Sequence, residues 1–127
     1  MKTTELKIGK RSFALAFDLN ALEDLQNTIP DFDLSKLSDY VRTPGGLLDL
    51  IVILAREGEA LEGRELDVDR RWFGAHISPS PANIANIHVV ILDCLRAGLS
   101  METEEEDPDA EVDEVLEEIK KKEERDG

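Results

Sequence analysis

The N-terminal part of the chain constrains the fold most, because two strands, a tight turn and a capped helix follow one another there without spacers. Residues 4–8 and 11–17 each alternate between two sets of side chains, as half-buried strands do. Gly9-Lys10 between them fits a two-residue hairpin turn with glycine first. Asp18 then suits the N-cap of a helix over residues 19–29, which Pro30 would end. An isolated hairpin is marginal in water, so these strands must pack on helices.

Two dipeptides mark the starts of the longer helices. Thr43-Pro44 and Ser80-Pro81 each place a capping hydroxyl before a proline at the first helical position. The first predicts a strongly apolar helix that is broken at Gly58, where an acidic loop up to Gly63 follows. The second predicts a long helix with a regular apolar stripe that ends near Gly98.

Shorter helices complete the predicted body. One reaches about Val41 after a cap at Asp33 or Ser35, and another covers residues 67–77. Leu19, Leu22, Leu25 and Ile29 are expected on the inner side of the first helix. The sequence therefore predicts a mostly α-helical α+β fold, in which a small N-terminal β-hairpin packs on about four or five helices and an acidic tail follows.

Charge divides the chain into two parts. Residues 101–127 contain 14 acidic and 4 basic side chains, whereas the whole chain of 127 residues has a net charge of −14. We therefore expect a helical domain over residues 1–99 and, over residues 100–127, an acidic linker followed by a charged amphipathic helix. Basic residues gather at the end of this last helix, where they complement its dipole.

The composition also argues against several classes of function. The negative charge repels nucleic acid and anionic membranes, so no nucleic-acid or membrane partner is expected. The longest apolar run, residues 50–55, is far shorter than a membrane span. The polar start of the chain predicts no signal peptide, and a single cysteine suits a reducing compartment, so we expect a cytosolic protein.

No motif in the sequence predicts catalysis, a cofactor or a metal site. His88 lies on the apolar stripe of the long helix, where a hydrogen-bonded core histidine is the more common outcome. Cys94 is six residues away, which does not place it on an adjacent turn, although spacing alone leaves a thiol–imidazole pair open. The acidic residues lack the glycine and bidentate glutamate spacing of a calcium loop.

Three apolar features predict a partner-binding surface instead. The helix after Pro44 is apolar on most sides, the pair Trp72-Phe73 is either core or a ligand platform, and the acidic tail carries a narrow apolar stripe. That stripe can fold onto a partner or cover a groove of its own chain. The candidate contact residues are Leu48, Val52, Ile53, Trp72, Phe73, Val112, Val115, Leu116 and Ile119.

The opening segment resembles the tail assembly chaperones of long-tailed bacteriophages and related prophages. The likeness lies in the strand and turn that lead into Phe13-Ala-Leu-Ala-Phe17-Asp18-Leu-Asn20-Ala-Leu-Glu23, and it continues in the Asn-Ile stretch of residues 82–87 and in the acidic tail. The resemblance implies a protein without enzymatic activity or cofactor. Such a chaperone binds the long helical tape measure protein and keeps it soluble while the tail tube assembles around it.

The resemblance also implies partners and a location. The tape measure protein is the expected partner, the tail tube protein is a second candidate, and assembly into a homo-oligomer is open. The protein would act in the host cytoplasm and be absent from the mature virion. Two alternatives remain at this stage: an acidic phage or mobile-element adaptor or inhibitor that mimics DNA, and a small enzyme that uses His88 and Cys94.

Overall fold

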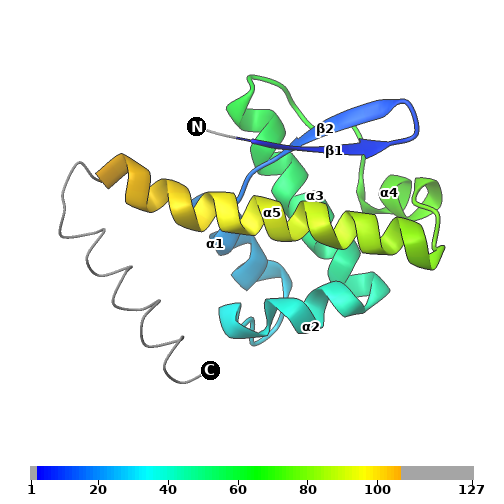
Figure 1. The fold of residues 1–127 in the computed structure, drawn as a ribbon, viewed down its shortest axis with the longest axis horizontal. Coiled ribbons are helices and arrows are strands. Elements are labelled where there is room, and N and C mark those ends of the chain that lie inside the picture. The colour runs from blue at the N-terminus through cyan, green and yellow to red at the C-terminus, as the bar shows by residue number, and fades with distance from the viewer. Residues whose placement is uncertain (1–2, 107–127) are drawn as a thin grey trace.

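The structure is a small β-hairpin packed on helices, as the sequence predicts (Figure 1). The computed structural model describes the backbone of residues 3–106 and the side chains of residues 3–99. In chain order the elements are β1 (Thr4–Ile8), β2 (Arg11–Leu15), α1 (Leu19–Thr28), the 3-10 turn η1 (Leu34–Lys36), α2 (Leu37–Arg42), α3 (Pro44–Leu61), α4 (Arg70–His76) and α5 (Pro81–Glu106).

The hairpin buries one face and pairs in the register that its turn dictates. Leu6 lies opposite Phe13, and both side chains are buried together with Leu15. Gly9 adopts φ +61°, a conformation that costs glycine little. Strand β2 ends at Leu15, two residues earlier than predicted, because Leu15 pairs with Thr4 at the start of β1. The N–H of Ala16 donates instead to the carbonyl of Leu54 in α3 at 3.0 Å.

Helix α3 forms the centre of the molecule. It packs against β2, α1, α2 and α4, so that it is enclosed on most sides. Val52 and Ile53 are therefore buried, and the prediction that they form spare apolar surface for a partner is wrong. Apolarity on most sides of this helix reflects its central position in the core.

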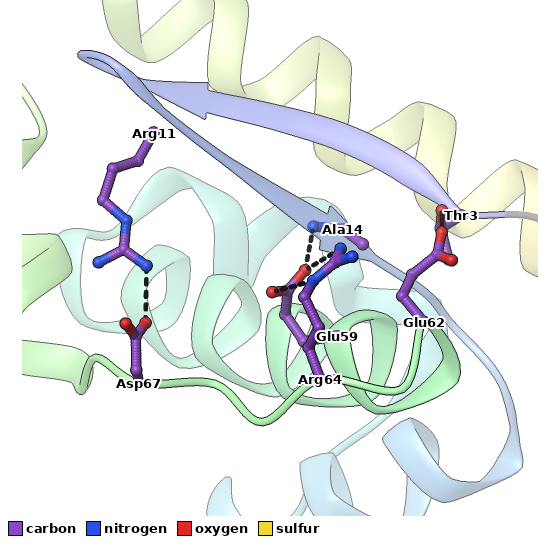
Figure 2. Close-up of polar contacts among 7 residues, drawn as sticks. All are labelled: Thr3, Arg11, Ala14, Glu59, Glu62, Arg64 and Asp67. Carbon is purple, nitrogen blue, oxygen red and sulfur yellow. Dashed lines mark hydrogen bonds and ion pairs between the residues drawn. The ribbon is translucent and has the colours of Figure 1, made fainter.

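A buried carboxylate joins the hairpin to this helix (Figure 2). Glu59 accepts a hydrogen bond from the backbone N–H of Ala14 at 2.9 Å, on the edge of β2 that faces away from β1. The guanidinium of Arg64 donates to both carboxylate oxygens of Glu59, at 3.0 Å each. This pairing holds the pKa of Glu59 below its usual value, against the opposing effect of burial.

Two glycines that the sequence analysis treated as helix breaks lie inside helices. Gly58 is part of α3, and a Cβ at this position would collide with the backbone carbonyl of Ala14. Gly98 is part of α5, and a Cβ there would collide with the carbonyl of Phe17. Gly58 thus lets α3 approach strand β2, and Gly98 lets α5 approach the backbone that leaves the hairpin. Because α5 continues to Glu106, residues 100–106 are helical and are not the predicted linker.

The helix caps agree with the sequence-based predictions better than these two glycines do. Asp18 accepts a hydrogen bond from Ala21 N–H, and Thr43 accepts one from Gly46 N–H, as expected of N-caps. Asp33 caps η1, and Asp69 caps α4, which is shorter than the predicted helix over residues 67–77. Leu19 departs from the prediction: it is 79% exposed, because α1 turns Ala21 and Leu25 toward the core.

Candidate partner-binding groove

The structure separates the residues predicted to bind a partner. Phe73 is fully buried with Val52 and Ile53, so these three side chains belong to the core of this chain. Leu48 and Trp72 are half-buried. The predicted tail contacts lie outside the described residues; they are Val112, Val115, Leu116 and Ile119.

Leu48 lies at the junction of two adjoining hollows, which together form what we call the partner groove. One hollow has a volume of about 310 Å³ and the other about 610 Å³. Both are lined by Leu48 and Gly74, which connect them. The groove runs along the start of α3, the whole of α4 and the start of α5. Its lining residues are Val41, Arg42, Thr43, Pro44, Leu47, Leu48, Asp69, Arg70, Arg71, Gly74, Ala75, Ile77, Pro79 and Ile84.

Local sequence signals position the walls of the partner groove. The Thr43 cap starts α3 at one wall, and the Asp69 cap, which accepts from Trp72 N–H at 2.9 Å, starts α4 at the other. Arg70 fastens α4 to α3, because its guanidinium donates to the carboxylate of Asp49 at 2.8 Å and to the carbonyl of Gly45 at 3.2 Å. The groove is thus bounded by helices that are tied together.

The charge of the partner groove differs from that of the chain. Arg42 and Arg71 are exposed on its walls beside Arg70, whereas Asp69 is the one acidic residue of its lining. An apolar floor of Leu47, Leu48 and Ile84 below these cations is complementary to an apolar segment with acidic flanks. The sequence pattern indicates Leu48 but not the arginines, since only the fold brings Arg42 and Arg71 to one groove.

Trp72 serves mainly to pack α4 against the hairpin. Its ring stacks on His76 at 4.1 Å between centroids and meets Phe13 edge-on at 5.6 Å. The guanidinium carbon of Arg11 lies 5.4 Å from the centre of the same ring. With this many neighbours, Trp72 is a packing residue with an exposed margin more than an open ligand platform.

His88 and Cys94 have different structural roles. The Nε2 atom of His88 lies 2.9 Å from the carbonyl oxygen of Val41, which joins α5 to the end of α2. The predicted hydrogen bond is therefore present, although His88 is half-buried and not fully in the core. Cys94 is buried, and burial raises the pKa of its thiol to about 12, so the thiolate is scarcely populated at neutral pH.

Within residues 3–99 no three histidine, cysteine or carboxylate side chains gather in a way that would hold a metal ion. Comparison with protein-family models, with curated proteins and with solved structures finds no match for this chain.

Proposed function

We propose that this chain is a tail assembly chaperone of a long-tailed phage or prophage, a protein without enzymatic activity that binds the tape measure protein in the host cytoplasm. The observation that carries the proposal is the partner groove, in which apolar side chains and exposed arginines adjoin on an otherwise acidic protein. The resemblance of residues 13–23 to such chaperones names the partner.

A helical segment of the tape measure protein suits the partner groove. A long amphipathic helix aggregates unless its apolar stripe is covered before assembly. Such a helix places apolar side chains at i, i+3, i+4 and i+7, and hollows between helices accept anchors at this spacing. Acidic residues beside those anchors would meet Arg42 and Arg71 at the rim.

Co-expression of the full chain with the tape measure protein of the same genome tests the proposal. We expect soluble tape measure protein only when this chain is present. Leu48→Asp should weaken the complex by at least about tenfold, since a charge would be buried in the apolar floor. Far-UV circular dichroism should stay unchanged, because Leu48 is only half-buried.

Leu19→Asp is the matched control, because it makes the same chemical change at a leucine that is 79% exposed on α1, outside the groove lining. It should bind like the parent. Equal binding by both variants would reject the partner groove as the contact surface. Tape measure protein that stays insoluble in the presence of this chain would reject the function itself.

The net charge of −14 favours a second candidate, an acidic adaptor or inhibitor that occupies a DNA-binding protein. Gene neighbourhood separates the two, because tube and tape measure genes would flank a chaperone gene. Mass analysis of the recovered complex would show whether the tail tube protein or further copies of this chain take part.

A further inference from the structure

Helix α5 exposes an apolar stripe on the side that faces away from the core. Val89 is 57% exposed, Leu92 37% and Leu99 52%, and together with Ala85 they follow one another at intervals of four, three and seven residues. Such spacing places them in one line along the helix. We call Ala85, Val89, Leu92 and Leu99 the α5 stripe.

The opposite side of α5 is ordinary core. Ile87, Ile91, Cys94 and Leu95 are buried, and the helix packs on β1. By length and composition residues 81–99 would be apolar enough to cross a membrane, and a core helix with a second apolar face passes the same test. The α5 stripe is therefore a surface to be covered, and its occupant follows from the chain that comes next.

The segment after α5 has the length to cover the α5 stripe. Val112 to Ile119 spans seven residues, and so does Leu99 to Leu92, so two antiparallel helices would match these ends. Val112 follows Glu106 by six positions in the chain, a distance of about 21 Å when the backbone is fully extended. Leu99 lies only about 10 Å back along α5 from Glu106, which is well within that reach.

The partner groove, by contrast, lies too far from Glu106 for this segment to cover it as a helix. Ile84 lines the groove at the start of α5, about 33 Å from Glu106 along the helix. Figure 1 shows α4, the groove wall, at the opposite end of α5 from its C-terminal end. A tail helix over residues 112–119 begins within about 21 Å of Glu106 and is about 10 Å long, so it falls short of covering the groove of the same chain while α5 is helical to Glu106.

The distribution of charge also supports packing of the tail segment on the α5 stripe. Arg96 interrupts the α5 stripe between Leu92 and Leu99, its side chain is 75% exposed, and it pairs with Asp93 only at 3.7 Å. In the tail, acidic residues flank the apolar positions between Val112 and Ile119. A helix from this segment would bring carboxylates beside the Arg96 guanidinium.

We propose that residues 112–125 fold back as an antiparallel helix on α5 of the same chain, with Val112, Leu116 and Ile119 covering the α5 stripe. The five residues 107–111 then form the connection of a helical hairpin. This inference stands independently of the proposed function. It assigns the α5 stripe to the chain itself and leaves the partner groove free for a partner.

Hydroxyl-radical footprinting of the full chain tests the fold-back, read at Leu92 and Leu99. The parent should show low labelling of both leucines at monomer mass and at every protein concentration. The paired change Val112→Asn and Ile119→Asn removes the apolar contacts, so labelling of both leucines should rise several-fold. The paired change Glu114→Gln and Lys121→Gln, on the opposite side of the tail helix and with no change in net charge, should label like the parent.

Two results would overturn the proposal. Equal, high labelling in the parent and both variants would mean that the α5 stripe is open. Protection that grows with concentration, together with a dimer mass by sedimentation, would mean that a second copy covers it.

Discussion

At the scale of single residues, Glu59 is the buried charged side chain that joins the hairpin to α3. Its carboxylate satisfies the buried N–H of Ala14 and is held by Arg64. Glu59→Ala would leave that N–H without a partner, and we expect the free energy of unfolding to fall by about 1–3 kcal/mol in urea denaturation. Glu59→Gln should cost less, because an amide oxygen can still accept from Ala14. Equal stability of the parent and Glu59→Ala would contradict this role.

The same residue predicts a pH dependence. The pKa of Glu59 is lowered in the folded chain from its usual 4.5, so its ionised form stabilises the fold at higher pH. This contribution is complete above pH 4.5 and is lost as the pH falls through the lower, folded-state pKa. The stability difference between the parent and Glu59→Gln should therefore shrink from neutral pH to about pH 3. A difference that stays constant would mean that the charge on Glu59 plays no part.

At the scale of elements, the glycines inside α3 and α5 set how closely the helices approach the hairpin. Alanine is about 1 kcal/mol more favourable than glycine inside a helix, so Gly58→Ala would stabilise an isolated α3. In the folded chain its Cβ meets the Ala14 carbonyl, and we expect a loss of about 1–3 kcal/mol by thermal or urea unfolding. Gly98→Ala should behave likewise at Phe17.

Gly45→Ala provides the control for this prediction. It lies near the start of the same helix as Gly58, and its Cβ would lie 3.5 Å from the Arg70 side chain, an ordinary contact. We expect this variant to be neutral or slightly stabilising. If Gly58→Ala also stabilised the protein, the distance between β2 and α3 would have to be larger than in this structure.

The elements also show what the sequence could and could not predict. Caps such as Asp18 and Thr43 were predicted correctly because a cap depends on residues within one turn. Gly58 and Gly98 were misjudged because a glycine ends a helix or admits a neighbour according to contacts made elsewhere in the chain. The partner groove was found only at Leu48 for the same reason, since its arginines come from α2 and α4.

At the scale of the whole molecule, α3 connects elements that come before it in the chain with α4, which follows it. It contacts β2, α1, α2 and α4, while α5 reaches the rest through β1 and through His88. The buried apolar residues of the described part of the chain form one cluster, so none of the described elements has a separate core. Helix, hairpin and groove should therefore be lost together when α3 is weakened.

Ile51→Ala tests this cooperativity. Ile51 is fully buried in α3, and its truncation should lower the free energy of unfolding by about 2–5 kcal/mol. Trp72, the single tryptophan of the chain, reports on α4 and the hairpin by fluorescence, whereas far-UV circular dichroism reports on all helices. Both signals should shift to the same lower urea midpoint.

Leu19→Ala is the control, because this leucine is 79% exposed. The free energy of unfolding from either signal should change by no more than about 0.5 kcal/mol. Separate midpoints would mean that the hairpin and α4 unfold as a unit of their own. The partner groove, whose walls include α4, would then open without loss of the helical core.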